Sequence, residues 1–130
     1  MSKEEKKKQI HEYDPTIFPM KVWVVYDCPV TVLKDMFPPS CNIEWEELGK
    51  SADAEVCTAT RLKPDRKVGT LIRFRSKAAM TAPVIAHEAD HAAFDILEYI
   101  GELPDASHQE THAYLVQWIT ECCLEVRNKY

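Results

Sequence analysis

The C-terminal part of this chain has apolar residues at a helical period that is broken once, at a stretch beginning with Gly101. Thr81 can cap a first helix, and Gly101 lies where the C-terminal cap of that helix belongs. Ser107 and Glu110 have the S-x-x-E spacing of a capping box, so a second helix is expected from Ser107 to about residue 126. Two consecutive helices with this spacing are expected to fold back and bring two of their faces together.

The residues before Thr81 are typical of a small sheet. Residues 20–27 form a β-branched and aromatic run that predicts a strand, and 31–37 predict a short helix that Pro residues stop. Residues 54–62 and 68–76 flank a turn-rich pentapeptide and predict an antiparallel hairpin. The fold expected is therefore α+β, with a small antiparallel sheet followed by two consecutive helices.

The second hairpin strand alternates in character, which predicts the face of each of its side chains. The residues expected to face the core are Thr70, Ile72 and Phe74, and those expected outside are Leu71, Arg73 and Arg75. The hairpin is also the basic part of an acidic chain, and we expect a solvated face there rather than a binding patch.

Length and composition restrict the class of protein. With 130 residues and 15.0 kDa, the chain has room for one domain, expected over 20–130 after a flexible arm over 1–19. The net charge of −5 argues against a dedicated nucleic-acid binder, and no apolar run is long enough to cross a membrane. The cysteines are odd in number and follow no export signal, which favours reduced thiols in a cytoplasm.

The first predicted helix contains His87-Glu88-Ala89-Asp90-His91, an H-E-x-x-H motif. Residues four apart lie on one helical face, so His87 and His91 can both point at one metal ion. Glu88 is rotated by about 100° from His87, which places its carboxylate beside the metal as a general base. Zn²⁺ is the expected ion, because two imidazoles and a carboxylate leave a fourth position for water.

A third ligand is needed, and the sequence offers more than one. Glu110 follows His91 after eighteen intervening residues, although a capping-box glutamate could instead bond the helix backbone. His108 is the main rival as third ligand because it lies near the helix start. His112 is expected well off the face that carries Glu110.

Other polar residues have possible supporting roles. Tyr114 and His112 are candidates for stabilising an oxyanion, and the sequence does not choose between them. Asp90 and Asp95 could orient the motif histidines, although surface carboxylates are the simpler interpretation. A peptide substrate could pair with a free sheet edge, for which the strand over 68–76 is the candidate.

The motif and its spacing to Glu110 resemble the gluzincin pattern of zinc metallopeptidases. The stretches VIAHEADHAAF and ETHAYLVQWI are also similar to small zincin-like proteins encoded by phages and prophages. The resemblance covers about residues 83–121 and implies a minimal zincin-like domain in a host cytoplasm. It implies a zinc site of His87, His91 and Glu110, with Glu88 as general base acting on a peptide or protein substrate. No aminopeptidase G-x-M-E-N signature or metzincin extension is present.

Two other functions remain open at this point. The chain could be a non-catalytic phage accessory protein whose zinc only staples the two helices together. It could also be a DNA-associated or repressor-cleaving protease, for which the basic hairpin is the support.

Overall fold

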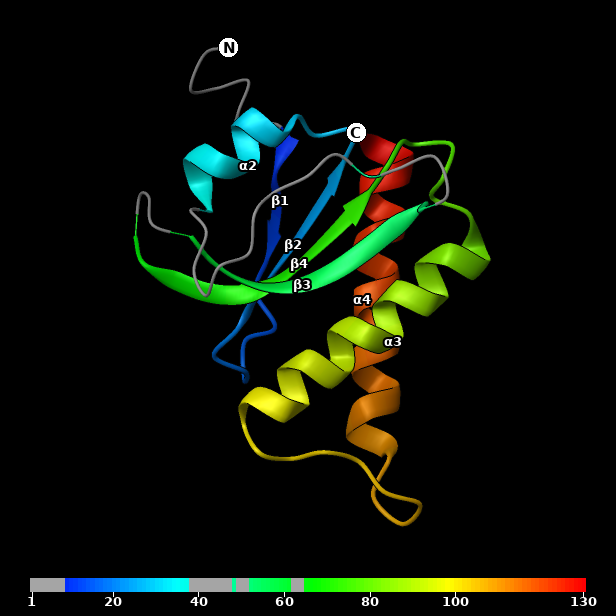
Figure 1. Cartoon of the computed structure of the whole chain (residues 1–130). Helices are drawn as coiled ribbons and strands as arrows, with labels where there is room; N and C mark the ends of the chain where they lie inside the picture. The colour runs from blue at the N-terminus through cyan, green and yellow to red at the C-terminus, as the bar shows by residue number, and fades with distance from the viewer. Residues whose placement is uncertain (1–8, 38–47, 49–51, 62–64) are drawn as a thin grey trace.

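The sheet of the computed structural model contains four strands in the order β1-β2-β4-β3, and two long helices follow it (Figure 1). The structure describes residues 9–37, 48, 52–61 and 65–130. This α+β class is the one expected from the sequence. The strands are β1 (His11–Tyr13), β2 (Lys21–Tyr26), β3 (Ala54–Arg61) and β4 (Lys67–Phe74), and the helices are α2 (Val30–Met36), α3 (Ala82–Tyr99) and α4 (Glu110–Lys129).

The sheet is mixed, so the prediction of an antiparallel sheet is wrong. The β3–β4 hairpin and the β1–β2 pair are antiparallel, but β2 and β4 run parallel, with Val24 opposite Ile72. Because β4 pairs on both sides, it is a central strand, and the prediction that it forms a free edge is also wrong. The described edge strand beside helix α3 is β3.

Part of the predicted N-terminal arm belongs to the sheet. Strand β1 pairs with β2, and the phenol of Tyr13 donates a hydrogen bond of 3.0 Å to Glu125 Oε1 on α4. A flexible arm over 9–19 is therefore wrong, and its first eight residues lie outside the described part of the chain. Strand β1 is only three residues long, which is too short for an alternating pattern to predict it from the sequence.

Both faces of the sheet are covered. Helices α3 and α4 pack on one face, and α2 lies against the other (Figure 1). As predicted, Ile72 and Phe74 are buried in the α3–α4 core. Leu71 and Arg73 are not exposed, contrary to the prediction, because the opposite face carries a second core around Trp23 and Phe37.

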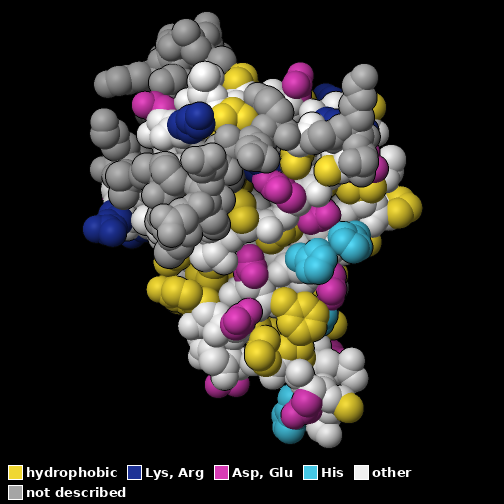
Figure 2. Space-filling view, in the orientation of Figure 1, with side chains coloured by type: hydrophobic (Ala, Val, Ile, Leu, Met, Phe, Trp, Pro, Cys, Tyr) yellow, Lys and Arg dark blue, Asp and Glu magenta, His cyan; other side chains and the backbone are white. Residues whose placement is uncertain are grey.

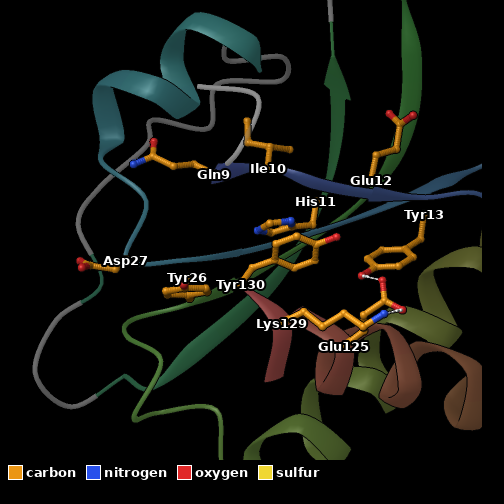
Figure 3. A pocket seen from close by; sticks show the side chains of 10 residues that line it. All are labelled: Gln9, Ile10, His11, Glu12, Tyr13, Tyr26, Asp27, Glu125, Lys129 and Tyr130. Carbon is orange, nitrogen blue, oxygen red and sulfur yellow. Dashed lines mark hydrogen bonds and ion pairs between the residues drawn. The ribbon is translucent and has the colours of Figure 1, made fainter. Parts of the chain in front are cut away.

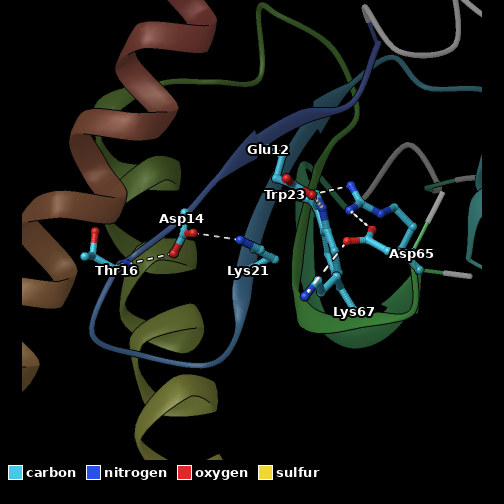
Figure 4. A network of polar contacts seen from close by, with 8 residues as sticks. Glu12, Asp14, Thr16, Lys21, Trp23, Asp65 and Lys67 are labelled. Atoms are coloured by element: carbon cyan, nitrogen blue, oxygen red, sulfur yellow. Dashed lines mark hydrogen bonds and ion pairs between the residues drawn. The ribbon is translucent and has the colours of Figure 1, made fainter. Parts of the chain in front are cut away.

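A polar network borders this second core at strands β1 and β3 (Figure 4). The indole Nε1 of Trp23 donates to Glu12 Oε1 at 2.9 Å, and the guanidinium of Arg61 lies 5.6 Å from the centre of the indole ring. Arg61 also pairs with Glu12 and, at 2.7 Å, with Asp65. The buried tryptophan thus has both its ring and its N–H group engaged.

The helix boundaries agree with the sequence at α3 but not at the start of α4. Thr81 caps α3 by accepting a hydrogen bond from the Val84 N–H, and Gly101 follows the helix with φ of 75°. The capping box at Ser107 is wrong, because the N–H of Ser107 donates to Asp105 Oδ1 in a turn before the helix. Helix α4 therefore begins at Glu110.

None of the described helices is both long and apolar enough to span a bilayer.

Candidate functional site

The two motif histidines lie together on the exposed side of α3. Their Nε2 atoms are 3.2 Å apart, and their ring centres are 4.8 Å apart. Two nitrogens bound to one tetrahedral zinc at 2.0–2.1 Å are separated by roughly 3.3 Å. The spacing of His87 and His91 therefore matches that of a metal-chelating pair, and it equally allows a hydrogen bond between neutral imidazoles.

Glu88 lies next to this pair but points inward. Its side chain is buried, with 7% of the residue exposed. Burial raises the pKa of the Glu88 carboxyl, and the neighbouring His87 and His91 partly oppose this shift. A buried carboxyl with a raised pKa, beside an exposed imidazole pair, is a suitable proton acceptor.

A cavity of about 500 Å³ connects the motif to edge strand β3. On the surface, histidine side chains lie among acidic ones over the α3 side of the molecule (Figure 2). The residues lining the cavity are Ala54, Glu55 and Val56 of β3 with His87, Glu88, His91, Phe94, Asp95 and Glu98 of α3. Phe94, Glu98 and Glu55 were not predicted as site residues, although the i, i+4, i+7 spacing from His87 and His91 could have indicated the first two.

Asp95 shares the cavity with the histidines and is anchored to the sheet. Its Oδ2 accepts hydrogen bonds from Thr70 Oγ1 at 3.2 Å and Thr58 Oγ1 at 3.5 Å. Burial raises the pKa of Asp95, and the two threonine hydroxyls act in the opposite direction. These bonds hold the middle of α3 against β3 and β4, which fixes the position of the histidine face.

Asp90 does not orient a motif histidine. Its Oδ1 lies 3.0 Å from Nε2 of His112, but the contact lacks hydrogen-bond geometry. The ring of His112 also packs against Phe94, with ring centres 4.5 Å apart. Asp90 therefore contacts helix α4 rather than His87 or His91.

The α4 residues predicted to complete the site lie elsewhere. Glu110 is exposed at the first turn of α4, because the buried stripe of this helix runs through Leu115, Ile119 and Cys123 and leaves Glu110 on the solvent side. Tyr114 is 67% exposed and lines a separate groove against the β1–β2 loop. His112, which the sequence analysis expected off the relevant face, is the one of these residues that faces α3.

His108 is also apart from the motif. It is exposed and pairs with Asp105 at 3.1 Å in the turn before α4. Over the described residues, no three His, Cys, Asp or Glu side chains are grouped so that they could hold one metal ion. The structure thus brings together His87, His91 and Glu88, but it does not bring Glu110, His108 or Tyr114 to them.

Three arginines of the basic hairpin are paired with carboxylates. Arg73 pairs with Glu55, Arg75 pairs with Asp53 at 2.7 Å, and Arg61 pairs as described above. Arginines that are already bound to carboxylates have little positive charge to offer a phosphate backbone. These three arginines therefore give little support to the DNA-associated function.

Three of the described cysteines have thiols of low reactivity. Burial raises the pKa of Cys57, Cys122 and Cys123 to about 12, and these thiols form no disulfide. Because the thiolate is the reactive form, we expect iodoacetamide at pH 8 to leave these three unmodified until the chain is unfolded. Peptide mapping by mass spectrometry measures this directly, and rapid modification of Cys123 in the native protein would contradict it. Cys41 lies outside the described residues.

Comparison with protein-family models, curated proteins and solved structures found no match. The expected similarity to gluzincin-like proteins therefore stays a prediction from the motif residues and their spacing. To these the structure adds an α+β fold and the paired histidines beside a buried glutamate.

Proposed function

We propose that this protein is a zinc-dependent hydrolase of peptide bonds, with His87 and His91 as metal ligands and Glu88 as general base. The observation that carries the proposal is the 3.2 Å separation of the two Nε2 atoms, with Glu88 adjacent to them. Bound zinc would supply a Lewis acid and lower the pKa of water at that place. Glu88 would accept the proton from that water and pass it to the departing amine.

The described residues supply two of the ligands that zinc requires. Catalytic zinc sites have three protein ligands, and the described residues present two of them as a ready pair. Glu110, the third ligand expected from the sequence, is exposed at the start of α4 and lies apart from the pair. Asp95 is the carboxylate that already lies one turn beyond His91 in the same cavity.

The substrate that suits this cavity is an extended peptide. Ala54, Glu55 and Val56 of β3 line the cavity, so a peptide paired with this edge strand would pass beside the histidines. Arg73 and Arg75 are occupied by carboxylates, so they give no reason to expect an acidic peptide. Phe94, which is 38% exposed, offers an apolar contact in the same cavity.

Zinc content tests the metal part of the proposal. The purified full chain should hold one equivalent of zinc after dialysis, and His87→Ala should hold close to none, because a single imidazole cannot chelate. Inductively coupled plasma mass spectrometry measures the metal. His108→Ala is the matched control, since it removes an exposed histidine that lies outside the cavity. Equal zinc in wild type and His87→Ala would refute the site.

A further inference from the structure

The carboxylate of Asp95 lines the histidine cavity without a cation to balance its charge. Its Oδ2 atom accepts hydrogen bonds from the hydroxyls of Thr70 at 3.2 Å and Thr58 at 3.5 Å, and both donors are neutral. Among the described residues, no Lys or Arg lines this cavity, and none forms an ion pair with Asp95. Burying a carboxylate is costly unless an opposite charge compensates it, so half-buried Asp95 would gain from a cation that a ligand brings.

A carboxylate in a second, larger cavity shows the contrast. That cavity measures about 820 Å³ and lies between strand β1, the end of β2 and the C-terminal turn of α4 (Figure 3). Its Glu125 accepts a hydrogen bond from the Tyr13 hydroxyl at 3.0 Å and lies 3.8 Å from Lys129 Nζ. The two cavities share no lining residue. The chain itself thus supplies a cation to Glu125, whereas its described part supplies none to Asp95.

A second carboxyl in the histidine cavity also lacks a bonded partner. Glu88 lines the cavity and is only 7% exposed, yet it forms no hydrogen bond or ion pair in the described part of the chain. Buried polar groups are almost always hydrogen-bonded, so this unpaired carboxyl indicates that a ligand belongs in the cavity. The proposed zinc site accounts for Glu88 but not for Asp95, because over the described residues Asp95 does not form a metal-binding group with the two histidines.

Asp95 lies where a peptide bound to the edge strand would present a side chain. Val56 and Thr58 are two residues apart in β3, so they share one face of the strand. Val56 packs against the α3–α4 core on that face, and Thr58 is exposed. Cross-strand neighbours on one face of a sheet have Cβ atoms about 4.5–5.5 Å apart. A peptide residue opposite Thr58 therefore comes close to the Asp95 carboxylate, which is 3.5 Å from the Thr58 hydroxyl.

We propose that Asp95 selects peptides that carry a lysine or arginine side chain, which it binds as an ion pair. The inference rests on the proposed function, because the peptide that pairs with β3 is taken to be the substrate. An acidic side chain at this position is repelled, and an aliphatic one leaves the carboxylate uncompensated. The two threonine hydroxyls hold Asp95 in place, so little conformational entropy is lost when the cation binds. Asp95 is therefore a specificity-determining residue and not a catalytic one.

Binding of three matched peptides tests this proposal. They have the sequence Ala-Thr-Val-Xaa-Val-Thr-Ala, with lysine, norleucine or glutamate as Xaa and the same neutral fluorophore at the N-terminus. Fluorescence anisotropy measures their affinity for the full chain, as purified and after EDTA has removed zinc, because the ion pair with Asp95 does not require the metal. We expect the lysine peptide to bind about fivefold or more tightly than the norleucine peptide, and the glutamate peptide to bind most weakly. Added NaCl should reduce this difference.

The variant Asp95→Asn identifies the group responsible. The amide oxygen of asparagine can still accept the threonine hydrogen bonds, so this variant removes the charge and keeps the anchor. We expect it to bind the lysine and norleucine peptides equally well, with unchanged zinc content. Asp90→Asn is the matched control, because it removes the same charge from α3 at a residue that contacts α4 and lies outside the cavity. It should discriminate between the peptides like wild type.

The outcomes separate this inference from the proposed function. Charge selectivity in a chain that hydrolyses no peptide would support the role of Asp95 and refute only the hydrolase. Hydrolysis without charge selectivity would overturn the role of Asp95 and leave the hydrolase standing. Absence of binding by all three peptides, or selectivity that persists in Asp95→Asn, would also overturn the proposal. So would loss of zinc from that variant, because Asp95 would then be a metal ligand.

Discussion

Replacing Glu88 by glutamine is expected to lower peptide hydrolysis by about 10²- to 10⁴-fold while zinc content stays at the wild-type level. Glutamine keeps the shape and burial of the glutamate side chain, but it cannot accept a proton at neutral pH. The metal ligands proposed here are His87 and His91, so their chelation does not require the Glu88 carboxylate. The measurement pairs cleavage of a fluorogenic peptide mixture with metal analysis of the same preparation.

The matched control for this variant is Glu98→Gln. Glu98 lines the same cavity on the same helix, but it is exposed and lies well beyond His91. We expect it to retain most of the activity, which would show that the loss in Glu88→Gln does not arise from lowering the negative charge of the cavity. If both variants hydrolyse peptide as well as wild type, Glu88 is not the base.

Removal of the metal by a chelator separates a catalytic zinc from a purely structural one. In a stapling role, the metal must join α3 to α4, and chelation should then melt the fold. Both proposed histidines belong to α3, and the cavity beside them is bounded by α3 and β3. We therefore expect EDTA to abolish hydrolysis with little change in the thermal midpoint, and a large fall in that midpoint would favour the staple.

Part of this site could be predicted from sequence because it depends on local geometry. His87 and His91 are four residues apart in a helix whose cap at Thr81 is also local, so their juxtaposition follows from helical periodicity. The partner residues across the cavity could not be found in that way. Glu55 and Val56 reach the motif because β3 is the edge strand beside α3, which is a property of the sheet order.

The rotation of α4 likewise depends on tertiary packing and not on a local sequence signal. A helix that began at Ser107, as the capping pattern predicts, would place Glu110 on the face toward α3. Asp105 holds the Ser107 N–H in a turn, the helix begins at Glu110, and the apolar stripe from Leu115 onward then turns His112 toward α3. Packing of this apolar stripe against the sheet core sets the rotation of α4. The free energy gained by burying the stripe outweighs the contribution of a capping pattern, which is about 1 kcal/mol.

The second core, on the α2 face of the sheet, was not predicted because it also depends on tertiary packing. It contains the residue whose replacement we expect to lower stability the most. Trp23→Ala is expected to lower the free energy of unfolding by about 3–5 kcal/mol. Trp23 is fully buried, its ring meets Phe37 edge-on with centres 4.9 Å apart, and Gly69 has no side chain where the indole passes. A Cβ added at Gly69 would lie 2.5 Å from the indole ring, so the strand carries glycine there to admit the tryptophan. Urea denaturation followed by circular dichroism measures the change.

Two further variants separate packing from the polar network around the indole. Trp23→Phe keeps an aromatic ring but removes the N–H donated to Glu12, so we expect a smaller loss than for alanine. Trp118→Ala removes a half-buried tryptophan on α4 that contacts Tyr13 at its edge, and we expect it to cost clearly less than Trp23→Ala. If Trp118→Ala proved the more damaging, the second core beneath α2 would contribute little, and the stability of this domain would depend on the α3–α4 face alone.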